Sequence, residues 1–153
     1  LPEHSGRYRE TAEFISGNGL AVYAFDLRSH GLSPDPPQAG RVHVDRFEDY
    51  FRDVGAVIGL AREAHGELPL FLLGHSMGGL ICMRYVLDHP DGLSGAIISS
   101  PALATHPDYK PPLILRLLVG VLSRLAPRFL VPSDLDSEAI SRDPAVTTVA
   151  ITA

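Results

Sequence analysis

The sequence predicts an α/β fold built on a parallel sheet, and two observations support this prediction. Residues 20–27, 68–74 and 94–103 form short, nearly continuous apolar runs, as expected for strands that are buried on both faces. Segments with apolar residues at helical spacing alternate with these runs along the chain. A strand that follows a crossover helix pairs in parallel with the preceding strand, so this order of elements predicts parallel pairing.

The helical segments have recognisable starts and stops. The first expected helix covers residues 8–19 and ends in a Gly-Asn-Gly run. The second is expected to start at Asp45 as N-cap, with Glu48 as its capping-box partner, and to stop near Gly66. A third helix, over residues 77–87, directly follows the second apolar run. The elements expected over the first two thirds of the chain therefore alternate regularly between helix and strand.

Composition excludes several classes of function. A chain of 153 residues with 45% hydrophobic and 20% charged residues is typical of one globular domain. The net charge of −5 argues against a nucleic-acid partner, since such proteins carry a basic excess. The single Cys82 cannot form an internal disulfide, and no Cys/His cluster suggests a metal site.

Membrane-targeting signals are also missing from these residues. The longest apolar run, residues 113–122, is interrupted by Arg116 and is shorter than the roughly 20 residues that cross a bilayer. The first residues lack the charged and apolar regions of a signal peptide. These features lead us to expect a cytoplasmic or peripherally membrane-associated protein.

The pattern Gly74-His75-Ser76-Met77-Gly78 suggests nucleophilic catalysis. A serine hydroxyl needs a neighbouring base, and a sharp strand-to-helix turn between small residues holds it clear of the sheet. The following helix directs free N–H groups at any anion that forms there, so the Met77 N–H is a candidate oxyanion-hole donor. The alternative is that Ser76 is only a turn residue and that the glycines serve helix packing.

Five stretches give the chain a family resemblance: EHSGRY (3–8), FDLRSHGLS (25–33), FLLGHSMGG (71–79), ISSPAL (98–103) and SRDP (141–144). In this order they resemble α/β-hydrolases of the monoacylglycerol lipase and lysophospholipase group, the serine aminopeptidase S33 type. The resemblance implies a partial hydrolase core over residues 1–103 and the beginning of a helical cap over residues 104–153. It also implies that Ser76 is the nucleophile and that no cofactor is needed.

The rest of the catalytic machinery departs from the family pattern. A His-Gly pair precedes the first matching stretch in the family, and by this alignment Leu1 takes the position of the second oxyanion donor. The acid and the histidine of the triad come after the cap in the family, in the chain order Ser, Asp or Glu, His. We therefore expect both to lie beyond Ala153, and residues 1–153 to be inactive alone. After Ser76 only His89 and His106 remain, and neither is expected to be the base.

The ending VTTVAITA does not follow the family pattern. We expect the chain to be the N-terminal part of a longer hydrolase. A truncated reading frame, a frameshift and a divergent terminus all remain open as explanations.

In the family, the DLRSHG loop braces the edge of the site. The resemblance therefore implies structural roles for Asp26, Arg28 and His30. Ser29 stands where the family usually has glycine, which leaves the conformation of this loop open.

The resemblance also suggests the substrate, a monoacylglycerol or lysophospholipid ester. Two interpretations of the apolar stripe on residues 113–125 remain open. It packs on the sheet as ordinary core, or it lines an acyl-chain tunnel and makes transient contact with membranes or lipid aggregates. A carboxylesterase, a thioesterase or a peptidase is an alternative within the same fold. The non-catalytic alternative is an inactive fragment or a lipid-binding module with a hydrolase-like fold.

Overall fold

The computed structural model describes residues 4–34, 43–104, 118–121 and 125. Its elements, in chain order, are the short 3-10 helix η1 (Ser5–Tyr8), α1 (Arg9–Gly17), α2 (Asp49–His65), β1 (Phe71–His75), α3 (Met77–Asp88) and β2 (Gly95–Ser99). Residues 118–121 and 125 are also helical. The chain thus alternates between helix and strand from α2 to β2, as predicted.

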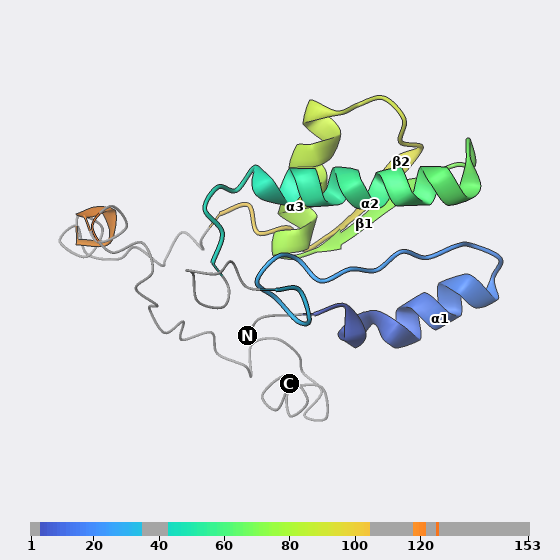
Figure 1. Cartoon of the computed structure of the whole chain (residues 1–153), viewed down its shortest axis with the longest axis horizontal. Helices are drawn as coiled ribbons and strands as arrows, with labels where there is room; N and C mark the ends of the chain where they lie inside the picture. Colours follow the sequence, from blue (N-terminus) through green and yellow to red (C-terminus); the bar gives the residue numbers. More distant parts are fainter. Residues whose placement is uncertain (1–3, 35–42, 105–117, 122–124, 126–153) are drawn as a thin grey trace.

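The two strands form a parallel pair connected through α3 (Figure 1). Their register runs from Phe71 opposite Gly95 to His75 opposite Ser99. The carboxyl ends of both strands therefore meet at the same edge of the sheet, where α3 begins. This confirms the predicted parallel pairing for the second and third apolar runs.

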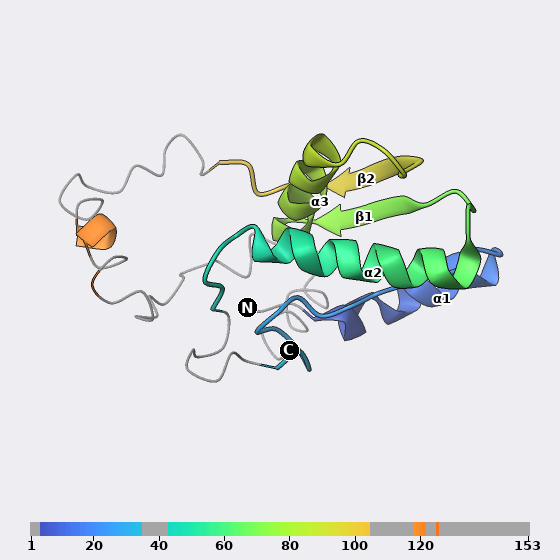
Figure 2. The same ribbon diagram turned by 45° about the horizontal axis from the view of Figure 1, so that its top comes forward.

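The core lies between α2 and α3. Tyr50 and Val54 of α2 and Ile81 and Tyr85 of α3 form one buried cluster. Helix α3 packs on both strands, and α2 packs on α3. In both ribbon views, α1 lies on the far side of α2 from β2 (Figure 2).

The predicted strand at residues 20–27 is not formed. This segment runs between α2 and α1 (Figure 1), but it pairs with no strand among the described residues. Apolar character favours burial, whereas a strand also needs a hydrogen-bonded ladder, which β1 shares here only with β2. The predicted burial on both faces is wrong for the first half of the segment, where Leu20, Val22 and Tyr23 are exposed.

The second half of the same segment is attached to the core. Phe25 and Leu27 pack against the buried cluster. Farther back along the segment, the Tyr23 hydroxyl lies 3.1 Å from Nε2 of His65 at the end of α2. Residues 20–27 therefore follow α2 without belonging to the sheet.

Burial on both faces is also wrong for β1 and β2. Gly74 of β1 is buried and Leu72 packs against the core, whereas Phe71 and Leu73 on the opposite face are exposed. Ile97 of β2, the register partner of Leu73, is 58% exposed. The reason is that α3 covers one face of this strand pair, and no other described element contacts the strands to a comparable extent.

The predicted start of the second helix is wrong as well. Helix α2 begins at Asp49, its N-cap residue is Glu48, and no side chain among the described residues caps it. The Asp45 carboxylate instead lies 3.1 Å from Nε2 of His43. The predicted stop is confirmed, since Gly66 follows the helix with φ 60°, a backbone conformation that favours glycine.

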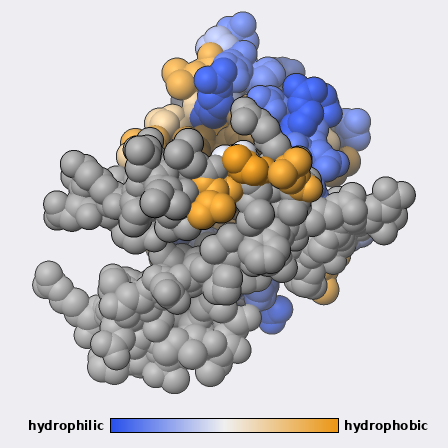
Figure 3. Space-filling view, turned by 90° about the vertical axis from the view of Figure 1, so that its left-hand side faces the viewer, coloured by the Kyte–Doolittle hydropathy of each residue, from blue (hydrophilic) through white to orange (hydrophobic). Residues whose placement is uncertain are grey.

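Only residues 118–121 and 125 of the predicted apolar helix 113–125 are described, and they are helical. Leu118, Val119, Val121 and Leu125 are each more than half exposed. Figure 3 views the molecule from the left-hand side of Figure 1 and shows hydrophobic side chains on that face. The predicted division between residues 103 and 104 remains a prediction, because most of the predicted cap lies outside the described residues. Among the described helices, none has the length and apolar character needed to cross a membrane.

Candidate active site

Ser76 occupies the junction between β1 and α3, the strand–turn–helix context that its motif requires. It is the N-cap residue of α3 and has φ 51° and ψ −119°. Residues other than glycine rarely adopt a positive φ, and such strain costs on the order of 1–3 kcal/mol. The residue is exposed, so its hydroxyl is held at the surface rather than within the sheet.

Gly74 makes this sharp turn possible. A Cβ atom at position 74 would lie 2.4 Å from the Gly78 carbonyl oxygen and 2.8 Å from Sγ of Cys82. The expectation that position 78 also needs a small residue is not supported by the described residues, none of which comes within 4 Å of a Cβ atom placed there. Sequence reasoning missed Gly79, where a Cβ atom would lie 3.3 Å from Pro101. The signal available in the sequence was the Gly78-Gly79 pair at the end of the FLLGHSMGG stretch (71–79).

Hydrogen bonds from a distant part of the chain hold the backbone of Ser76. Its N–H donates to the Ser99 carbonyl at 3.0 Å. Its carbonyl accepts from the Leu80 N–H within α3 and from the Ala102 N–H, both at 3.1 Å. The segment after β2 therefore lies against Ser76. Ser99 and Ala102 belong to the ISSPAL stretch (98–103) that carried the family resemblance, but the sequence assigned them no role at the site.

Met77 begins α3 directly after Ser76. The first N–H groups of a helix have no partner within the helix and carry its positive dipole end. The Met77 N–H thus has the position expected of an oxyanion donor, while the Met77 side chain packs against the core. Leu1, the expected position of the second donor, lies outside the described residues.

The described histidines are engaged elsewhere. Nδ1 of His75 lies 3.2 Å from Oγ of Ser99. His89 stacks on Tyr85 at the far end of α3, 13 residues and roughly 20 Å from Ser76. Among the described residues, no histidine or carboxylate hydrogen-bonds to the Ser76 hydroxyl, and His106 lies outside them.

The loop after residues 20–27 is built around Asp26. Its carboxylate accepts hydrogen bonds from the Ser5 N–H at 2.6 Å and from the Leu32 N–H at 2.7 Å. Burial alone would raise the pKa of Asp26, but hydrogen bonds from the Leu32 and Ser5 backbone outweigh it and place the pKa below its ordinary value of 3.8. A Cβ atom at Gly31 would collide with this carboxylate. Asp26 therefore closes the loop onto η1.

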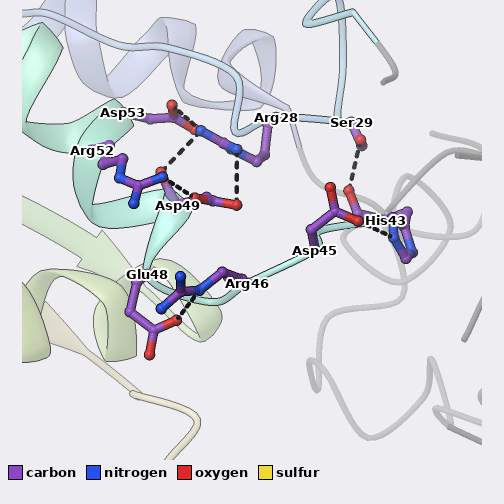
Figure 4. A network of polar contacts seen from close by, with 9 residues as sticks. All are labelled: Arg28, Ser29, His43, Asp45, Arg46, Glu48, Asp49, Arg52 and Asp53. Atoms are coloured by element: carbon purple, nitrogen blue, oxygen red, sulfur yellow. Dashed lines mark hydrogen bonds and ion pairs between the residues drawn. The ribbon is translucent and has the colours of Figure 1, made fainter. Parts of the chain in front are cut away.

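Arg28 ties the same loop to α2 (Figure 4). Its guanidinium donates two hydrogen bonds to the Asp53 carboxylate, at 2.7 and 2.6 Å, and lies 3.3 Å from the Asp49 carboxylate. Asp49 also binds Arg52. The hydrogen bonds with Asp53 raise the pKa of Arg28. These contacts connect the loop to α2 and indicate a structural role for Arg28.

The two residues after Arg28 are buried. Ser29 takes φ 61°, which gives a physical reason to expect glycine at this position. Its hydroxyl donates to the His43 carbonyl at 2.8 Å (Figure 4). Nδ1 of His30 lies 2.9 Å from the Arg28 carbonyl oxygen. Serine at this position therefore adopts the positive φ, and its hydroxyl is hydrogen-bonded within the loop region.

Cys82 lies behind the Ser76 turn and is buried. Burial raises the pKa of its thiol, which disfavours the reactive thiolate. Within the described ranges, no group of three or more His, Cys, Asp or Glu side chains could hold a metal ion.

Comparison with known proteins agrees with this geometry. The family model described as serine aminopeptidase, S33, matches residues 1–151. The chain belongs to this family of hydrolases. A monoacylglycerol lipase of Mycolicibacterium smegmatis is 39% identical over 144 residues, which cover 94% of this chain and 49% of that protein. The human monoglyceride lipase is 33% identical, with coverages of 92% and 45%.

Solved structures of this hydrolase family have the same fold. The monoacylglycerol lipase of Paleococcus ferrophilus matches with a TM-score of 0.79 and 39% identity, over 99% of this chain and 54% of that one. A soluble variant of monoglyceride lipase from Saccharomyces cerevisiae, solved with a substrate analog, matches with a TM-score of 0.77 and 28% identity, over 99% and 49%. The described elements are thus part of an α/β-hydrolase core, and the chain spans about half the length of the relatives it matches.

Proposed function

We propose that this chain carries the nucleophile of a serine hydrolase that cleaves carboxylic esters of lipids. The observation that carries the proposal is the backbone of Ser76, exposed at φ 51° between β1 and the N-terminus of α3. This conformation costs free energy. Ser29 and Ser100 also have a positive φ, but among the described residues only Ser76 combines it with a place between the end of a strand and the N-terminus of a helix. Two of its relatives are named monoacylglycerol lipase and monoglyceride lipase, which supports a lipid ester as substrate.

The position of Ser76 supports the following proposed reaction. The Ser76 hydroxyl attacks the ester carbonyl carbon while a histidine accepts its proton. The oxyanion that forms accepts a hydrogen bond from the Met77 N–H, and we place the second donor at the position of Leu1. Collapse of the intermediate expels the alcohol, which takes the proton from the histidine and leaves an acyl-enzyme that water hydrolyses. We place the histidine and its acidic partner outside these 153 residues.

A monoacylglycerol or a lysophospholipid is the proposed substrate. The exposed apolar side chains of Leu118, Val121 and Leu125 fit a surface that meets acyl chains, a lipid aggregate or the periphery of a membrane. A carboxylesterase, a thioesterase or a peptidase would use the same nucleophile. An inactive or lipid-binding module is the second candidate.

Labelling with a fluorophosphonate, read by intact mass, tests the nucleophile. We expect the whole protein to gain one adduct, Ser76→Ala to gain none, and Ser94→Ala, which alters another exposed serine, to label normally. Release of fatty acid from a monoacylglycerol should exceed hydrolysis of a peptide amide. An unlabelled, folded whole protein would favour the inactive module.

The same probe tests where the base lies. We expect the 153-residue chain to remain unlabelled even when circular dichroism shows that it is folded. Labelling of this chain at Ser76 would instead place an activating group within it, and His106 would be the first residue to substitute.

A further inference from the structure

The turn that follows β2 holds both ends of the Ser76 residue. The Ser99 carbonyl accepts the Ser76 N–H, and the Ala102 N–H donates to the Ser76 carbonyl. As the N-cap of α3, Ser76 has an N–H that the helix itself does not satisfy. In the described part of the chain, Ser99 is therefore the partner that fixes the direction of this N–H.

A second contact links Ser99 to the residue before Ser76. His75 and Ser99 are register partners at the ends of the two strands. Oγ of Ser99 lies 3.2 Å from Nδ1 of His75, while the Ser99 carbonyl receives the Ser76 N–H. One residue of β2 thus contacts both residues of the His75–Ser76 peptide, which leads into the strained conformation.

Close packing limits movement of this turn. Pro101 lies so near Gly79 that a Cβ atom there would be 3.3 Å from it. Ser100, in the middle of the turn, has φ 42°, a second unfavourable backbone conformation beside that of Ser76. Strained residues persist only where the surrounding structure holds them in several ways, and this turn does so for Ser76.

We propose that the turn Ser99–Ala102 positions Ser76. In this proposal Ser99 is a positioning residue, and its hydroxyl acts through its contact with the His75 side chain. Ser99 takes no part in bond breaking. Its hydrogen bonds keep the Ser76 backbone, and with it the hydroxyl, in one orientation relative to the start of α3. The conformational part stands on the contacts alone, and the consequence for catalysis rests on the function proposed above.

Three variants of the whole protein test the proposal. Ser99→Ala removes the hydroxyl, Ser99→Thr keeps it, and Ser94→Ala is the matched control. Ser94 precedes β2 at its opposite end, and its hydroxyl accepts a hydrogen bond from the Leu70 N–H at 3.3 Å. Ser94→Ala and Ser99→Ala therefore each remove one exposed hydroxyl that contacts a residue in or next to β1.

The first measurement is amide hydrogen exchange at Ser76 and Ala102 by NMR, which does not depend on activity. We expect Ser99→Ala to speed exchange at both amides by about 3- to 10-fold, as the loss of one hydrogen bond implies, and the other two variants to leave it within about twofold. Equal exchange in Ser99→Ala and Ser94→Ala would overturn the proposal, whatever the activity.

The second measurement is steady-state hydrolysis of a soluble monoacylglycerol. Ser99→Ala should lower kcat by about 3- to 10-fold with little change in KM, and Ser99→Thr should restore it. A fall in activity that Ser99→Thr fails to restore would contradict the role of the hydroxyl. If wild type hydrolyses no ester and is not labelled, the proposed function fails, and the exchange data still decide whether the turn holds Ser76.

Discussion

Replacing Gly74 by alanine should destabilise the protein through a collision within the backbone. The new Cβ atom would lie 2.4 Å from the Gly78 carbonyl oxygen, whereas ordinary contact begins near 3.4 Å, so the first turn of α3 must move by about 1 Å. Overpacking of this kind costs about 1–3 kcal/mol. The lower chain entropy of alanine in the unfolded state recovers less than about 1 kcal/mol. Since a backbone oxygen cannot rotate away, we expect a net loss of about 2 kcal/mol in the free energy of unfolding.

Urea denaturation followed by circular dichroism measures this loss, and the melting temperature should fall by about 4–8 °C. Gly78→Ala is the matched control, because its Cβ atom would meet no described residue within 4 Å and alanine favours the helix. It should be neutral or more stable by up to about 1 kcal/mol. Gly74→Ala as stable as this control would refute the reasoning. Rescue by Cys82→Ala would show that the collision is with the thiol rather than the backbone.

Three further predictions concern stability. Ser76→Gly should be more stable than Ser76→Ala by about 1 kcal/mol in urea denaturation, because only glycine relieves the positive φ, and equal stabilities would contradict strain at this position. Arg28→Lys loses the paired hydrogen bonds to a carboxylate and should cost about 1 kcal/mol, whereas Arg84→Ala, on an exposed pair within α3, should cost less than about 0.5 kcal/mol. The depressed pKa of Asp26 stabilises the fold above the ordinary pKa of 3.8, and this contribution is lost as the pH falls through the lower pKa of the folded state. Thermal melts from pH 6 to pH 2 should therefore show a shallower loss of stability for Asp26→Asn than for wild type, and parallel profiles would refute the assignment.

Much of this fold was predictable because the relevant signals are local. The apolar run before Gly74, the glycines around Ser76 and the helical spacing after Met77 lie next to one another in the chain. They predicted a strand, a sharp turn and a helix, and the structure contains all three, with α3 ending one residue later than expected. Parallel pairing of β1 and β2 followed from their order, because a crossover helix leaves little choice.

The errors arose where an element depends on which hydrogen-bond partners the chain provides. Residues 20–27 have the composition of a strand, but the described structure provides them no ladder. Asp45 has the chemistry of a helix cap, but its carboxylate contacts His43 instead. In both cases side-chain chemistry permits the expected structure. A missing distant strand partner decides the outcome for residues 20–27, and a competing contact two residues away accompanies it for Asp45.

The amino-acid sequence by itself determined that Ser76 would stand between a strand and a helix, since residue spacing and the need for glycine at position 74 act over a few residues. Only the tertiary structure decided what holds it there. Ser99 and Ala102 bind the Ser76 backbone from more than 20 residues away along the chain, and nothing in their own side chains announces this role. Backbone N–H and C=O groups occur at nearly every position, so their pairing becomes specific only when the packing of β1, β2 and α3 brings particular residues together.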